Sequence, residues 1–183
     1  SEVEKVEKDL RKLIKDNRDS VRRVKEEAEK LVEENRRSVE EVRRTIKELL
    51  ERLEKLVRDR GTEEVKKTVE DVMRRVEELL RRVRETSEEV ARRLEKLVED
   101  VRRTSEDVMR RLKKLLEELR RVSDKRLVDK VRRELEKILR DDNRIIKEVL
   151  DTVRRLSEDN LKKVKDVLEE LTRIAEEVRE RAR

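Results

Sequence analysis

The residues of this chain whose types and spacing could do chemistry are neutral polar side chains set among aliphatic ones. Asn17 and Ser20 stand where the aliphatic pattern of the first third calls for apolar residues, and Asn35 and Ser38 repeat them at the same spacing further along the chain. An asparagine amide offers two donors and an acceptor, and a serine hydroxyl donates or accepts. The chemistry that this set predicts is therefore hydrogen bonding, not nucleophilic attack or proton transfer.

Residue types on which most catalytic and metal sites depend are missing. The chain has no His, Cys, Phe, Trp, Tyr or Pro and a single Gly, which excludes imidazole bases, thiolates, zinc fingers and stacking platforms. One glycine cannot build a phosphate loop. Acidic pairs such as Asp141 with Asp142 would bind a hard cation only weakly, and we interpret them as solvated faces or helix caps. We therefore expect no enzyme activity, no cofactor and no metal.

Charge is abundant but balanced. Charged residues make up 57% of the chain, and 55 basic against 49 acidic residues give a net charge of +6. Basic pairs such as Arg110 with Arg111 alternate with acidic residues, which is typical of solvated helix faces with ion pairs one turn apart. Specific nucleic-acid binding would need a one-sided basic stripe. We expect no specific nucleic-acid partner and only weak binding at low salt.

Nothing in the sequence predicts a membrane partner. No stretch approaches the roughly 18–20 apolar residues of a membrane span. The first residues, from Ser1 to Glu4, have neither the basic start nor the apolar core of a signal peptide. We expect a soluble protein that stays in the cytoplasm when it is expressed recombinantly.

Aliphatic residues recur at alternating steps of three and four along the whole chain, which predicts amphipathic helices. The pattern breaks first at Gly61, which suits the left-handed end of a helix, and Thr62, which suits an N-cap. It breaks again near residue 123, where Ser123 or Asp124 would cap the next helix.

These breaks predict helices at about 2–59, 63–121 and 125–181, each close to 58 residues and about 87 Å long. Equal helices joined by short loops must run antiparallel to their neighbours in sequence. The predicted fold is all-α: one domain over residues 1–183, an up-down-up antiparallel three-helix bundle.

Folding the chain back at the two breaks brings polar residues of all three helices together. One cross-section collects Asn17, Ser20, Thr104, Ser105, Asp142 and Asn143, and another collects Asn35, Ser38, Thr86, Ser87, Ser157 and Asn160. We predict that these are buried hydrogen-bond layers, about 27 Å apart, which fix register because slipped helices would bury unpaired polar groups. Thr45 and Thr172 are candidates for a smaller third site. The alternative is that these residues face solvent or mark turns, since the run from Asp141 to Asn143 resembles a cap.

The middle helix also contains an internal repeat. The segment that begins at Thr68 recurs at Thr86 and again at Thr104, so each copy begins eighteen positions after the one before it. This period equals five turns of an α-helix, so the pattern returns to the same face without the drift that forces a supercoil. The period therefore predicts straight, untwisted helices.

With this period, a Glu/Lys/Arg surface, a Val/Leu/Ile core and no aromatic residues, the whole chain resembles parametrically designed de novo helical bundles. The resemblance is one of style and not a motif match. It implies a hyperstable monomeric scaffold with untwisted helices and buried hydrogen-bond networks. It also implies no natural biochemical function, no natural location in a cell and no required partner.

Two other interpretations stay open. The second is an interaction module that assembles with copies of itself or with a partner through Val21, Val39, Leu50 and Val57, which flank the main apolar stripe of the first helix. Its mass in solution separates this interpretation from a monomer. A natural spectrin-like or lipid-binding bundle is the third, and such proteins usually carry aromatic residues.

Overall fold

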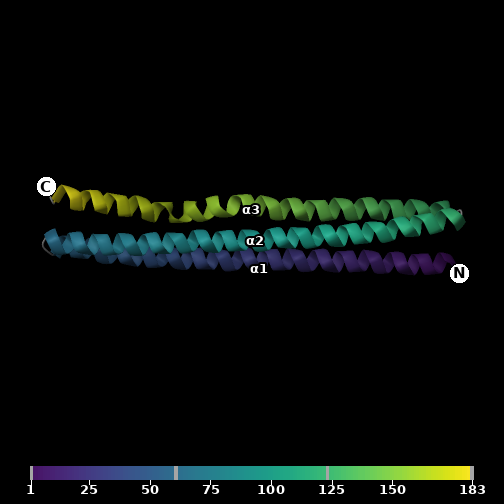
Figure 1. Ribbon diagram of the computed structural model, residues 1–183, viewed down its shortest axis with the longest axis horizontal. Coiled ribbons are helices and arrows are strands. Elements are labelled where there is room, and N and C mark those ends of the chain that lie inside the picture. The colour runs from purple at the N-terminus through teal and green to yellow at the C-terminus, as the bar shows by residue number, and fades with distance from the viewer. Residues whose placement is uncertain (1, 60–61, 123, 182–183) are drawn as a thin grey trace. The chain divides into compact units, whose positions relative to one another are not determined.

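The computed structural model describes residues 2–59, 62–122 and 124–181, which form three α-helices apart from Asp124 (Figure 1). These are α1 (Glu2–Asp59), α2 (Thr62–Val122) and α3 (Lys125–Arg181). The prediction of an all-α fold with three long helices is confirmed. The observed bounds lie within one residue of the predicted ones. Gly61 and Ser123, for which we predicted turn and cap roles, lie outside the described residues.

The start of α3 is fixed by a side-chain cap. The backbone N–H of Leu127 donates to Asp124 Oδ1 at 3.3 Å, and that of Val128 donates to the Asp124 carbonyl at 3.1 Å. An N-cap aspartate satisfies one of the N–H groups that the first turn of a helix leaves without a partner. Of the two candidates in the sequence, Asp124 is therefore the residue that caps α3.

The contacts between helices divide the chain into two compact units. The first unit comprises Ser1–Leu31 and Arg92–Val153, and the second comprises Val32–Ala91 and Arg154–Arg183. Each helix contributes one segment to each unit. Within each unit the segments of α1 and α3 run parallel, and α2 runs opposite to both (Figure 1).

In the first unit the core is aliphatic and comes from all three helices. On α2 the buried positions follow steps of four, three and four, so they lie along one face of the helix. The core residues are Val6, Leu10 and Leu13 of α1, Val108, Leu112, Leu115 and Leu119 of α2, and Leu127, Val131 and Ile138 of α3.

The second unit has a core of the same kind. Val39, Val83 and Val164, one from each helix, form a small cluster of their own. The larger cluster consists of Ile46, Leu50, Leu53 and Val57 of α1, Val65, Val69, Val76 and Leu79 of α2, and Val167, Leu171 and Ile174 of α3.

At several positions the buried stripe of α1 in this unit lies one residue away from the one that the sequence predicted. We placed Ser38 on the inward face and Val39 beside it, but Ser38 is exposed and Val39 is fully buried. Leu50, also predicted to flank the stripe, is buried, whereas Leu49 is only half-buried. The physical reason is that a face carrying Val39 and Leu50 gains more by leaving water than one carrying the Ser38 hydroxyl.

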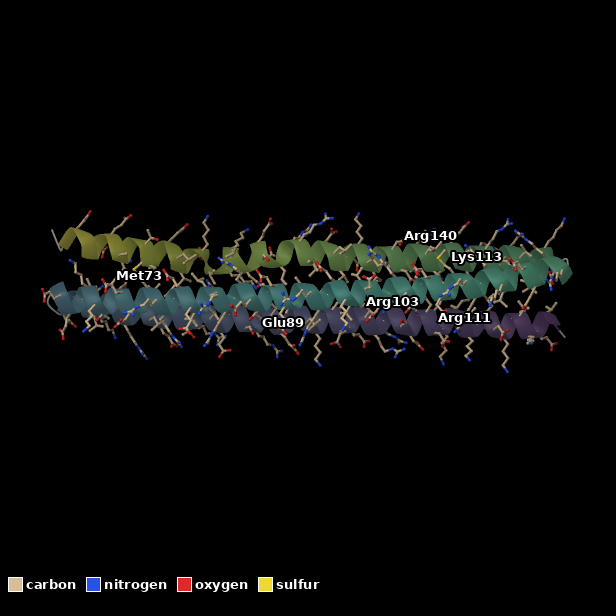
Figure 2. All side chains as sticks on the ribbon, viewed as in Figure 1. Met73, Glu89, Arg103, Arg111, Lys113 and Arg140 are labelled. Atoms are coloured by element: carbon tan, nitrogen blue, oxygen red, sulfur yellow. The ribbon has the colours of Figure 1, made fainter. Side chains whose placement is uncertain are left out.

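Charged side chains cover the outside of the helices (Figure 2). Most of their ion pairs join residues three or four apart on one helix, such as Arg22 with Asp19 at 2.6 Å. Among the pairs of the described residues, Arg173 of α3 reaches Glu54 of α1 at 3.0 Å. Exposed pairs of this kind each contribute about 0–1 kcal/mol. Stability therefore depends on the core.

Truncating Leu112, which is fully buried in the first unit, tests this conclusion. We expect Leu112→Ala to lower the free energy of unfolding by about 2–5 kcal/mol, because it removes apolar contacts and leaves a cavity. The matched control is Leu161→Ala, since Leu161 is 54% exposed. Denaturant unfolding that shows equal losses for the two variants would contradict this assignment of the core.

Candidate functional site: two buried polar layers

Among the described residues, six polar side chains are buried in the aliphatic core, and they form two sets of three. One set, the Asp142 layer, lies in the first unit and consists of Asn17 of α1, Ser105 of α2 and Asp142 of α3. The other set, the Asn160 layer, lies in the second unit and consists of Asn35 of α1, Ser87 of α2 and Asn160 of α3. All six side chains are 9% exposed or less.

The two layers have the same spacing along all three helices. Asn17 bonds Asp142 and Asn35 bonds Asn160, and in both pairs the two residues are 125 positions apart in sequence. Each residue of one layer is eighteen positions from its counterpart in the other, which is five turns of helix. The same face of each helix therefore contributes to both layers, and the same register of α1 against α3 pairs both.

Asn160 connects the three helices of its layer. Its Nδ2 group donates to Asn35 Oδ1 at 2.9 Å and to Ser87 Oγ at 2.6 Å. The Ser87 hydroxyl in turn donates to the backbone carbonyl of Val83 at 2.7 Å. Asn35 Nδ2 is a buried donor without a partner. One amide thus holds α1, α2 and α3 together through polar contacts.

The Asp142 layer contains fewer donors. Asn17 Nδ2 donates to Asp142 Oδ1 at 3.2 Å, while Asn17 Oδ1 and Asp142 Oδ2 are buried without partners. Burial raises the pKa of the Asp142 carboxyl group above its ordinary value. Hydrogen bonds from Asn17 and Ser105 oppose this rise, and the charge of Asp141 adds to it. The layer thus contains an acid that is easier to protonate than an ordinary aspartate.

A second, half-buried contact lies beside the Asp142 layer. The Ser20 hydroxyl of α1 donates to Thr104 Oγ1 of α2 at 3.5 Å, which is a long contact for two hydroxyl groups. Thr104 donates to the carbonyl of Asp100 on its own helix at 3.0 Å. The structure therefore brings together Asn17, Ser20, Thr104 and Ser105 at this level.

Four residues that we placed in the layers lie outside them. Asn143 and Ser157 of α3 are exposed. Ser38 is exposed and Thr86 is half-buried, and both line a groove between α1 and α2. Asn143 follows Asp142 by one residue, which turns it about 100° away from the buried face. From the sequence we placed both Asp142 and Asn143 at this level, and burial in the folded bundle separates them.

Asp142 is the one of these two residues that belongs to the layer, and the period of the repeat contained the signal. Counting one period back from Asn160 gives Asp142 and not Asn143. The smaller site considered at Thr45 and Thr172 does not form. Each of these hydroxyl groups donates to a carbonyl of its own helix, at 3.0 and 2.9 Å.

The described part of the chain contains neither a metal cluster nor a membrane span. Among residues 2–59, 62–122 and 124–181, no three acidic side chains come together as ligands for a metal ion. No helix within the same ranges has a stretch that is long and apolar enough to cross a bilayer.

Asn160 and Asn35 offer a matched test of the polar contacts, because both are buried asparagines and they make different numbers of hydrogen bonds. We expect Asn160→Ala to cost about 1 kcal/mol more than Asn35→Ala, since it removes two interhelical bonds and leaves the Asn35 amide unpaired. Denaturant unfolding of both variants measures the difference. An equal or smaller loss for Asn160→Ala would contradict its central place in the layer.

No protein-family model matches the chain, and no curated protein matches it in sequence. A solved structure described as "Computationally designed three helix bundle" is similar over 97% of this chain and 88% of that chain, with a TM-score of 0.53 and 22% sequence identity. At this identity the similarity concerns the fold alone. The chain has the fold of a three-helix bundle.

Proposed function

We propose that the chain is a de novo designed structural scaffold without catalytic activity, whose two buried polar layers specify the register of its helices. Three findings support the proposal: the fold is similar to that of a designed bundle, the surface is built from Glu, Lys and Arg, and the chain lacks aromatic residues. Without His, Cys or aromatic residues, this composition offers few side chains for catalysis or for binding a cofactor.

The observation that carries the proposal is the common register of the two layers. A slip of α3 by two turns would place Asn35 opposite Val153 or Val167 in place of Asn160. Each polar group left buried without a partner costs about 1–3 kcal/mol. The aliphatic core residues are less demanding, because one valine or leucine can replace another as a neighbour. The polar layers therefore penalise registers that the core alone would tolerate.

The scaffold works as a single chain in this proposal. Leu161 is the large apolar side chain that stands exposed among the described residues, and one leucine does not make an interface of ordinary size. The alternative is a self-assembling or partner-binding module that uses half-buried residues such as Val21. A mass in solution of 22.3 kDa supports the single chain, and a multiple of that mass supports assembly.

Register can be measured directly, because the chain has no cysteine and two introduced thiols would carry the only spin labels. The two cysteines replace Arg37 on α1 and Lys162 on α3. Both residues are exposed, and they are as far apart in sequence as Asn35 and Asn160. We expect one narrow distance distribution in the labelled parent protein. Making both layers apolar should broaden or split this distribution. The variant that does so combines Asn17→Leu, Asn35→Leu, Asn160→Leu, Ser87→Ala, Ser105→Ala and Asp142→Leu.

A variant in which only the Asn160 layer is apolar is the matched control. It keeps the Asp142 layer, so it should retain the single distance. If the variant without either layer also keeps the parent's narrow distribution, the layers do not specify register.

A further inference from the structure

Asp142 is the one ionisable residue among the six buried polar side chains, and its layer has fewer hydrogen-bond donors than the Asn160 layer. The two unpartnered atoms there, Asn17 Oδ1 and Asp142 Oδ2, are acceptors when the carboxyl group is ionised. In the Asn160 layer the equivalent side chain of α3 is an amide that supplies two donor bonds. Replacing that amide by a carboxylate removes the hydrogen atoms that would satisfy the neighbouring groups.

One proton would restore a donor to this layer. Asn17 Nδ2 already donates to Asp142 Oδ1 at 3.2 Å. The remaining oxygen atoms of these two planar groups are the two that lack partners. A carboxylic acid has one O–H donor, so an acid and a primary amide can pair through two antiparallel hydrogen bonds. The second bond of this pair exists only when Asp142 carries a proton.

We propose that the Asp142 layer is a proton-binding site that couples the stability of the first unit to pH. With a proton on Oδ2, Asp142 donates to Asn17 Oδ1 and the pair is closed. Without it, the layer buries a carboxylate that has one acceptor atom unsatisfied. This inference goes beyond the scaffold proposal, and it holds whether or not the layers specify register.

Charged groups on two of the three helices border this site. Along a groove of about 240 Å³ between α1 and α3, α1 presents Arg18, Arg22 and Lys25, and α3 presents Glu134, Lys137, Asp141 and Arg144. The buried face of α2 at this level consists of Val101, Ser105 and Val108, none of which titrates.

The basic groups of this groove do not neutralise Asp142. They are exposed, so solvent and salt screen their charges. Arg22, for example, pairs with Asp19 at 2.6 Å. In the part of the chain that the structure describes, no ion pair involves Asp142. Burial is the dominant influence on its pKa, and the direction of that influence is upward.

The sign of the pH dependence follows from this direction. Because the pKa of Asp142 is raised in the folded protein, the folded state keeps the proton at pH values where the unfolded chain has lost it. The stabilisation by this proton is fully present below the ordinary aspartate pKa. It is lost as the pH rises through the raised value of the folded state.

The substitution Asp142→Asn tests the proposal, because it gives both layers the same Asn–Ser–Asn composition. We expect the variant to have a higher denaturation midpoint than the parent at neutral pH. This gap should shrink toward zero as the pH falls below the ordinary aspartate range. Each unit by which the folded pKa exceeds the unfolded one corresponds to a tenfold change in the folding equilibrium constant.

Asp141→Asn is the matched control, since it removes the same charge from the exposed neighbouring residue. We expect its pH dependence to stay close to that of the parent, because burial raises the pKa of Asp142 more than the charge of Asp141 does. A carbon-13 titration of the Asp142 carboxyl group in the folded parent gives an independent reading and should show a midpoint above that of ordinary aspartates. A gap between Asp142→Asn and the parent that does not change with pH, or a carboxyl midpoint at or below the ordinary value, would overturn the proposal.

Discussion

The pairing of buried amide and hydroxyl groups is the constraint on which the rest of this structure depends. Aliphatic burial supplies most of the driving force in each unit, but it is non-directional and tolerates one neighbour in place of another. A hydrogen bond from Asn160 to Asn35 and Ser87 requires particular residues at particular levels on three helices. In the proposed function, the core holds the helices together and the polar layers determine which residues meet.

The two layers show how one change of side chain alters a site that is otherwise repeated. Asn160 and Asp142 occupy equivalent positions, one period of the repeat apart, and have nearly the same shape. The amide donates two bonds and leaves one donor of its layer unpaired, while the carboxylate only accepts and leaves two acceptors unpaired. Burial of the ionised carboxylate is costly, and it raises the pKa of Asp142.

The sequence predicted the helices and their ends well, because aliphatic periodicity, turn residues and capping residues are all local signals. The cap at Asp124 and the ends of α1 and α3 follow from such signals. The faces of the helices were harder, since Ser38 and Val39 lie on adjacent positions and only the packing of three helices decides which is buried. Asp142 and Asn143 were placed at the same level from the sequence, and only the repetition of the layer after five helical turns singles out Asp142. The repeat was therefore the better guide to the buried position.

The side-chain amide protons of asparagine test the central claim most directly. The chain has four asparagines and no glutamine, so four amide pairs account for all such signals in its NMR spectrum. Asn17, Asn35 and Asn160 are buried, and the exposed Asn143 is an internal reference. If the layers form as described, the Asn160 amide protons exchange with solvent much more slowly than those of Asn143 and show contacts to Asn35 and Ser87. Exchange of the Asn160 protons at the rate of Asn143 would contradict a buried, hydrogen-bonded layer.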